Sequence, residues 1–225
     1  MAVAAYVIRC AAMIAMMGNS LGSTARIIKM TKLSDDLRIT MQMMSRDVRR
    51  SNYNANALFC YANSKCSENS AAVTLAGEVS IMNNGVAVTD GSNGNCLVYQ
   101  LDRDHDGDSL KSATNQDEVG GFRRAVDGGV GVLEMWVGNS MPNCGADAGD
   151  GDWVAISNAN NMDITAFEVN DAQSFTAEVF NDGMGNTLNQ RVRRIHMNLT
   201  GRLVMDNSIT RQLEETINIR NDILL

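Results

Sequence analysis

The chain has 225 residues, a formal net charge of −7 and 44% hydrophobic residues, which is enough length and apolar content to bury a substantial core. The charge is unevenly divided, because residues 1–52 contain eight Lys and Arg against three Asp, whereas the remainder is strongly acidic. A basic segment can bind nucleic acid or an anionic membrane. Without interleaved aromatic residues or a DNA-reading motif, nucleic acid is not an expected partner.

The N-terminal 52 residues are predicted to form one long helix. Residues 1–18, MAVAAYVIRCAAMIAMMG, are almost wholly apolar apart from Arg9, yet they fall short of the roughly 20 residues that a bilayer span needs. They also lack the basic start and small-residue cleavage site of a secretory signal. From residue 24 onward, apolar residues recur every three or four positions, which is typical of a helix packed on its own domain. This apolar stripe consists of Ile27, Met30, Leu33, Leu37, Met41, Met44 and Val48.

After Asn52 the pattern changes to short apolar runs with period two, which are typical of β-strands. Asn83-Asn84-Gly85 and Asp127-Gly128-Gly129 each separate two such runs and tolerate positive φ, so each predicts a hairpin. CLVYQLD (96–102) is expected to be a buried strand, and further strands are expected at AAVTL (71–75) and over RVRRIHMNLTGRLVM (191–205). We expect roughly eight to ten strands and no second helix. The predicted fold is therefore α+β, with a stalk helix in residues 1–52 and an antiparallel β-rich head in residues 53–225.

Four of the five cysteines, Cys60, Cys66, Cys96 and Cys144, lie in head segments rich in Asn, Gly and Ser, and Cys10 lies in the apolar N-terminal segment. Paired CxxC or Cys/His spacings, which a zinc site would need, are not present. The pattern favours two disulfides, Cys60–Cys66 and Cys96–Cys144, which would indicate an oxidising compartment. Unpaired buried thiols are the alternative.

The strongest local motif is DRDHDGDS, residues 102–109, which matches the start of a calcium-binding loop. Alternate carboxylates before a glycine can converge on one hard cation. The candidate ligands are Asp102, Asp104, Asp106 and Asp108. The last position of an EF-hand loop is occupied by Ala113, where a bidentate Glu belongs. Asp117, Glu118 or the acidic stretch 147–152 could complete a different cage. The alternative is a solvated acidic turn.

The sequence contains no recognisable catalytic motif. Its two histidines are His105 and His196, and His196 alternates with apolar residues on a predicted strand, so we expect it to face solvent or a polar neighbour. A Ser/His/Asp order, a nucleophile elbow, a phosphate-binding loop and a metalloprotease helix are all lacking. We therefore expect no enzyme activity, although paired carboxylates of the kind used in glycoside hydrolysis stay open because acidic residues are abundant.

The length of the predicted helix points to a structural role. A helix of about 50 residues would extend about 75 Å, which is more than the head can cover. Its first half is apolar nearly all round and must be buried in a bilayer or among other helices. A helical stalk that carries a disulfide-bonded β head outside the cytoplasm is the design of type IV pilins and pseudopilins.

Several segments resemble the PilW-type minor pilins of that superfamily. MMSRDVRRSNYN (43–54) is similar to the end of their stalk helix, and CLVYQLDRDHDGD (96–108) resembles a strand that runs into an Asp/Gly turn. GFRRAVDGGVGVLEMWVG (121–138) resembles their Gly-Phe-Arg hairpin, CGADAGDGDWVAISN (144–158) a Cys…Trp segment, and ETINIRN (215–221) their last strand. The resemblance extends over most of the chain as an ordered set.

The resemblance implies a minor pilin that joins other minor pilins through its N-terminal helix and primes pilus assembly at the filament tip, without catalysis. It also implies a single pass through the inner membrane with a periplasmic head, followed by incorporation into an extracellular pilus. A type II secretion pseudopilin is one alternative, and a membrane-anchored, calcium-binding, adhesin-like head is another. The family's Gly-Phe-Thr-Leu-x-Glu motif and leader do not occur in the sequence, so we expect Met1 to be an internal methionine of the mature helix.

Overall fold

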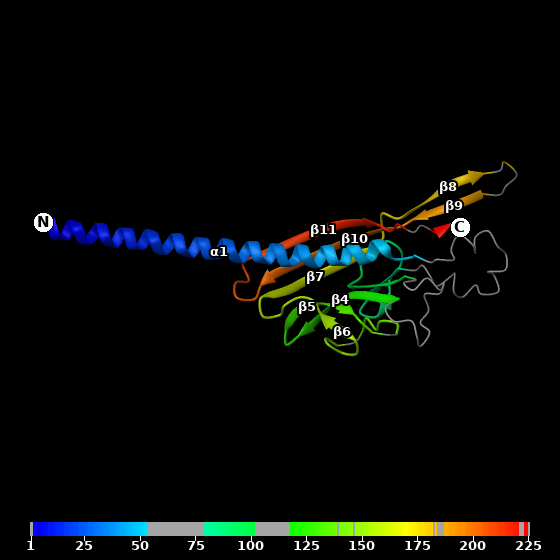
Figure 1. Cartoon of the computed structure of the whole chain (residues 1–225), viewed down its shortest axis with the longest axis horizontal. Helices are drawn as coiled ribbons and strands as arrows, with labels where there is room; N and C mark the ends of the chain where they lie inside the picture. The colour runs from blue at the N-terminus through cyan, green and yellow to red at the C-terminus, as the bar shows by residue number, and fades with distance from the viewer. Residues whose placement is uncertain are drawn as a thin grey trace.

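The described part of the chain consists of one N-terminal helix followed by an antiparallel β-rich domain, which is the α+β fold predicted from the sequence (Figure 1). The computed structural model describes residues 2–53, 79–101, 118–138, 140–145, 147–181, 183, 187–220 and 223–224. Helix α1 extends from Ala2 to Arg50 and contains 49 residues. It is continuous through Gly18 and Gly22, although glycine lowers helix stability by about 1 kcal/mol relative to alanine.

The described part of the head contains twelve strands in three antiparallel sheets. The first sheet has the order β2-β1-β3-β4-β5-β6, and its strands are β1 (Ser80–Asn83), β2 (Val86–Ala87), β3 (Cys96–Gln100), β4 (Val119–Asp127), β5 (Val130–Trp136) and β6 (Trp153–Ala155). The second has the order β11-β10-β7, with β7 (Met162–Asn170), β10 (Arg194–Leu203) and β11 (Thr210–Asn218). The third has the order β12-β9-β8, with β8 (Phe175–Asn181), β9 (Thr187–Val192) and β12 (Ile223–Leu224).

Both predicted hairpin turns are confirmed. Asn84 and Gly85 connect β1 to β2 with φ values of 49° and 82°, and Gly128 and Gly129 connect β4 to β5 with φ values of 56° and 87°. Two successive positive φ values suit the right-handed twist of the flanking strands and favour Asn or Gly at both positions. The buried strand predicted from CLVYQLD is β3, all five residues of which are buried.

One strand prediction is wrong, and another falls on residues that the structure does not describe. The apolar run 191–205, which reads as one strand in the sequence, is divided between β9 and β10. The division falls at Arg193, which is buried and donates a hydrogen bond from Nη2 to the carbonyl oxygen of Val79 at 2.9 Å. The chain passes from the third sheet to the second at this residue. The strand predicted around residues 71–75 lies outside the described residues.

The C-terminal half of α1 packs against β10 and β11. Five members of the predicted stripe are buried, namely Leu33, Leu37, Met41, Met44 and Val48. They share one hydrophobic core with side chains of the first and second sheets. Burial of each such side chain contributes about 1.5–3 kcal/mol. The helix comes so close to β10 that a Cβ on Gly201 would lie 3.1 Å from Leu37, so only glycine fits without displacement.

The predicted stripe extends one turn too far toward the N-terminus. Ile27 is 61% exposed and Met30 is only partly buried. The head ends near this point, where Arg26 donates a hydrogen bond from Nη2 to Ser208 Oγ at 3.3 Å in the connection between β10 and β11. Helical periodicity shows which side chains share a face, but it does not show where the covering sheet stops.

Candidate functional site

The N-terminal part of α1 projects beyond the head as a single rod (Figure 1). Residues 2–25, which we call the projecting segment, account for about 36 Å of helix. Every described side chain from Met13 to Lys29 is exposed. The large apolar side chains among them are Met13, Met16, Met17, Leu21, Ile27 and Ile28.

These apolar side chains form a broad surface. Met16 and Met17 are adjacent and therefore leave the helix about 100° apart, while Leu21 lies about one turn beyond Met17. Leu21 is 72% exposed. Large apolar side chains that gather on an exposed surface mark an interaction site, and a surface this broad can contact more than one neighbouring helix. The described part of the chain contains no helical stretch long and apolar enough to qualify as a membrane span.

Glu215 of β11 fixes the head to the helix near its C-terminal end. Its carboxylate accepts a hydrogen bond from Ser45 Oγ at 2.6 Å and one from Arg49 Nη2 at 3.0 Å. The backbone N–H of Asn52, just past the helix, donates to the carbonyl oxygen of Gln100 in β3 at 3.0 Å. The end of α1 is therefore bonded to both the first and the second sheet, so a force on the projecting segment is transmitted directly to the head.

The other end of the helix–head contact is polar. Asp206, between β10 and β11, accepts hydrogen bonds from the side-chain and backbone donors of Ser208 at 2.6 and 3.1 Å. These two bonds lower the pKa of Asp206 below its ordinary value of 3.8, and the positive charges of Arg26 and Lys29 act in the same direction. A basic helix edge thus meets an acidic turn where α1 leaves the head.

A disulfide lies in a second, smaller hydrophobic cluster of the head, which we call the tryptophan cluster. Its buried residues are Cys96, Val98, Val119, Trp136, Cys144 and Trp153. Cys96 of β3 and Cys144, in the segment between β5 and β6, are joined with their Cα atoms 5.9 Å apart, which is one of the two pairs that the sequence predicts. The rings of Trp136 and Trp153 meet edge to face with centroids 5.3 Å apart. The disulfide therefore attaches a long connecting segment to the centre of the first sheet.

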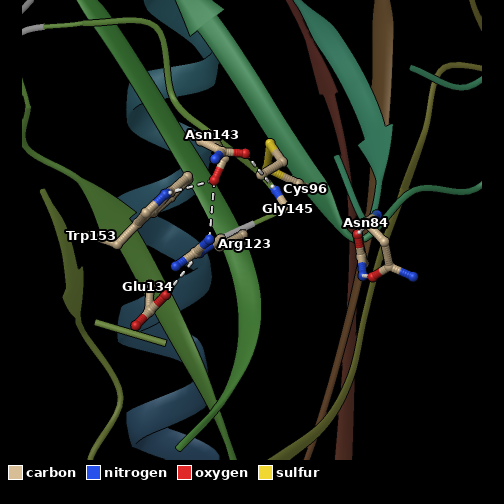
Figure 2. Close-up of a disulfide and its surroundings, with 9 residues drawn as sticks. Asn84, Cys96, Arg123, Glu134, Asn143, Gly145 and Trp153 are labelled. Carbon is tan, nitrogen blue, oxygen red and sulfur yellow. Dashed lines mark hydrogen bonds and ion pairs between the residues drawn. A yellow bond between two sulfur atoms is a disulfide. The ribbon is translucent and has the colours of Figure 1, made fainter. Parts of the chain in front are cut away.

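Arg123 and Glu134 form a buried ion pair beside this disulfide (Figure 2). Arg123 Nε lies 2.8 Å from Glu134 Oε2, and the exposed fractions of the two side chains are 1% and 2%. Arg123 also donates to the carbonyl oxygens of Asn143 and Asp147 at 3.1 and 2.6 Å. Its guanidinium lies 4.3 Å from the ring centroid of Trp153, a distance typical of a cation–π contact.

The carboxylate of Glu134 has a second partner in the same segment, because Glu134 Oε1 accepts a hydrogen bond from Gly149 N–H at 2.7 Å. Buried charges are tolerated only when they are paired and hydrogen-bonded, and both members of this pair meet that condition. With its donors engaged by the carboxylate and two backbone carbonyls, Arg123 is suited to holding the loop between β5 and β6 in place. The pair is therefore structural.

Most of the predicted site residues lie outside the described residues. This applies to the calcium candidates Asp102, Asp104, Asp106 and Asp108 and to the predicted disulfide partners Cys60 and Cys66. The described residues contain no group of three or more His, Cys, Asp or Glu placed to hold a metal ion. Glu118 is buried, and Asp147 interacts with Arg123 through its backbone oxygen. His196 is partly exposed beside Thr216, with Nδ1 3.1 Å from Oγ1, as the sequence predicts.

Sequence reasoning missed the Arg123–Glu134 pair and the Glu215 contact with the helix. The first had a signal. A two-residue turn at Gly128-Gly129 places Asp127 opposite Val130, and each step back along β4 then matches one step forward along β5. Counted in this way, Arg123 lies opposite Glu134, and the register of the two strands confirms it. The second had none, because Glu215 is far from Ser45 and Arg49 in sequence and the contact depends on how the helix lies on the sheet.

A scan against protein families matches residues 26–219 to the family described as PpdB, prepilin peptidase-dependent protein B. The match begins where α1 meets the head and ends just after β11. Neither a curated protein nor a solved structure matches the chain. Because the family match covers most of the chain and the fold is pilin-like, the chain belongs to the prepilin peptidase-dependent protein B family and is related to the type IV pilins.

Proposed function

We propose that the protein is a minor pilin that assembles with other pilins and primes the assembly of a type IV pilus, at the tip of the filament. The observation that carries this proposal is the division of α1 into two halves. One half is buried against the head, and the other projects from it with large apolar side chains in solvent.

The projecting segment needs partners because its exposed apolar side chains are costly in water. Burial of apolar surface contributes about 25 cal/mol per Å². Helices of other pilins can bury the segment in a filament, and the lipid of the inner membrane can do so before assembly. The head would then lie in the periplasm first and outside the cell afterwards. An oxidising compartment agrees with the Cys96–Cys144 disulfide.

This role requires contacts and no catalysis. The helix end is joined to the head through Glu215 and the backbone of Asn52, so packing of the stalk also positions the head. The family's description supports processing by a prepilin peptidase, which makes the protein a substrate of an enzyme. We infer that its own contribution is to hold the first subunits of a filament together.

The test compares two equally exposed apolar positions on the helix. Leu21 lies in the projecting segment and Ile39 lies on the outer face of the half that packs on the head, and they are 72% and 64% exposed. Each is replaced by Asp in a strain in which the native gene is deleted. We expect Leu21→Asp to reduce the number of surface pili seen by electron microscopy to that of the deletion strain, and Ile39→Asp to preserve it.

The length of the remaining pili distinguishes priming from a role in the shaft. A priming subunit should leave few pili of normal length, because initiation is lost while elongation continues. Short pili would indicate a shaft subunit and contradict the proposed tip role. Normal pilus numbers combined with loss of protein secretion would contradict the proposal and indicate a type II secretion pseudopilin.

A further inference from the structure

The third sheet forms an arm at the end of the head opposite the N-terminus (Figure 1). We define the arm as β8, β9 and β12. Its base is fixed to the body, because Arg194 N–H donates to Ser174 Oγ at 3.0 Å and Ser174 Oγ lies 3.3 Å from the Arg194 carbonyl oxygen. Arg191 of β9 also pairs with Asp90 at 3.0 Å. Beyond this base, β8 and β9 extend away from the other two sheets.

Strand β8 is an edge strand of the arm as the structure describes it. It pairs with β9 on one side, and no strand of the described chain pairs with its other side. Six of its seven residues are exposed. They include three large apolar side chains, Phe175, Val179 and Phe180, of which Phe180 is 60% exposed. An unpaired strand edge offers backbone N–H and C=O groups to another extended segment.

The other sheet edges are protected in ways that β8 is not. Strands β2, β12 and β6 contain two, two and three residues, which is too short to offer much of a template. Strand β7 is mostly buried, and its Val169 is bridged to Gly94 by two backbone hydrogen bonds. Strand β11 has nine residues, but its fully exposed positions are all polar, such as Gln212 and Glu214. Strand β8 contains no Lys, Arg or Pro, and its only charged residue is Glu178. In the part of the chain that the structure describes, the feature that protects β8 is a bulge between Glu178 and Phe180.

We propose that β8 is a docking strand to which an extended, apolar segment of another protein adds as a fourth strand of the arm, with a Lys or Arg of that segment opposite Glu178. Strand addition supplies affinity through backbone hydrogen bonds and specificity through side chains. Phe180 would pack against apolar or β-branched side chains of the added strand, and Phe175, whose ring centroid lies 5.0 Å from the Arg194 guanidinium, would contact them at the base of the arm. Glu178, whose one contact among the described residues is an exposed hydrogen bond from Asn181 at 3.3 Å, would select a basic one.

Charge argues against a second copy of this chain as the occupant. Glu178 is the central residue of β8, so two antiparallel β8 strands paired about their centre would place two carboxylates opposite each other, which is destabilising. Residues 53–225 as a whole contain 23 Asp and Glu against 11 Lys and Arg, so two heads also repel each other. The partner is therefore a different, more basic protein. This surface lies at the opposite end of the molecule from the projecting segment and functions independently of it.

The proposal is tested with three labelled nine-residue peptides of alternating Val and Thr that differ only in the central residue, which is Lys, Thr or Glu. Their binding to the full chain in detergent micelles is measured by fluorescence anisotropy. We expect the Lys peptide to bind most tightly and the Glu peptide most weakly, with the Thr peptide between them. The Kd values of the Lys and Glu peptides should differ by about two- to tenfold. Glu178→Lys should invert that order. The matched control Glu214→Lys, on the exposed polar edge of β11, should leave it unchanged.

Phe180→Ser should weaken binding of all three peptides, because it removes apolar contact area without altering the charge at Glu178. The proposal is overturned if no peptide binds at concentrations up to about 1 mM, or if Glu178→Lys leaves the order of affinities as it was. It is also overturned if the wild-type chain forms a dimer that Phe180→Ser dissociates, because the occupant would then be a second copy.

Discussion

Removal of the negative charge from the buried Arg123–Glu134 pair should destabilise the head strongly. Glu134→Gln preserves the volume of the side chain and can still accept the hydrogen bond from Gly149 N–H. It leaves the Arg123 guanidinium buried without an opposing charge, beside the backbone carbonyl oxygens of Asn143 and Asp147 and the ring of Trp153. Breaking a buried ion pair by removing one partner costs about 3–5 kcal/mol. Since Gln retains part of the hydrogen bonding, we expect about 3 kcal/mol for this substitution.

The expected loss is large compared with the total stability of a domain, which is about 5–15 kcal/mol. For a chain of this size it corresponds to a fall in Tm of about 6–12 °C. Arg123→Met should cost more, about 5 kcal/mol, because it also removes the donors to Asn143 and Asp147. Urea unfolding followed by tryptophan fluorescence suits the measurement, since both tryptophans of the chain, Trp136 and Trp153, lie in the tryptophan cluster around the Cys96–Cys144 disulfide.

Two further variants distinguish the loss of the buried ion pair from a nonspecific loss of stability caused by any substitution. The double variant Arg123→Met/Glu134→Leu should be less destabilised than Arg123→Met alone, because it leaves no unpaired buried charge. Arg191→Gln breaks an exposed pair of similar length with Asp90 and should cost less than about 1 kcal/mol. The reasoning is refuted if Glu134→Gln costs no more than Arg191→Gln, or if the effects of the two substitutions in the double variant simply add.

Three further predictions concern the disulfides, the helix contact and calcium. Cys96→Ser should lower the free energy of unfolding by about 4 kcal/mol, since the bridge joins residues 48 apart. Alkylation of the denatured, non-reduced wild-type chain should label Cys10 alone if Cys60 and Cys66 are also paired. Glu215→Gln should lower the free energy of unfolding by about 1–2 kcal/mol in urea titrations, because it weakens two partly exposed, charge-assisted hydrogen bonds. Calcium should raise the Tm through RT ln(1 + [L]/Kd), Asp104→Ala should remove that rise, and an unchanged Tm in excess calcium would indicate a solvated turn.

Local chemistry made the strands and turns of the head predictable. Asn84-Gly85 and Gly128-Gly129 each combine a tolerance of positive φ with flanking apolar alternation, and both signals act within a few residues. Strand β3 was recognisable because a strand that is buried throughout is apolar throughout. The α+β class followed from the same signals, together with the absence of a second helical pattern after Asn52.

Contacts between distant segments were not predictable in the same way. The exposure of Ile27 depends on where β10 and β11 end, and the partners of Glu215 depend on the position of the helix on the sheet. The arm could not be distinguished from other hairpins, because the sequence of β8 resembles an ordinary core strand. Its Phe180 is exposed because the third sheet extends away from the body, whereas Phe175, at the base of the arm, lies with its ring centroid 5.0 Å from the Arg194 guanidinium. Apolar patterning indicates which residues prefer burial, but it does not show which of them lack a partner.

The central claim is that the projecting segment packs against helices of other pilins, and site-specific cysteine crosslinking in pilus-producing cells tests it most directly. In a Cys10→Ser background, Leu21→Cys places a thiol on the exposed projecting segment, and Leu37→Cys places one in the core between helix and head, where the native side chain is 0% exposed. The account predicts oxidative crosslinks from position 21 to the stalk helix of another pilin carrying a matching cysteine, and none from position 37. Crosslinking of both positions to the same extent, or of neither in cells that assemble pili, would contradict it.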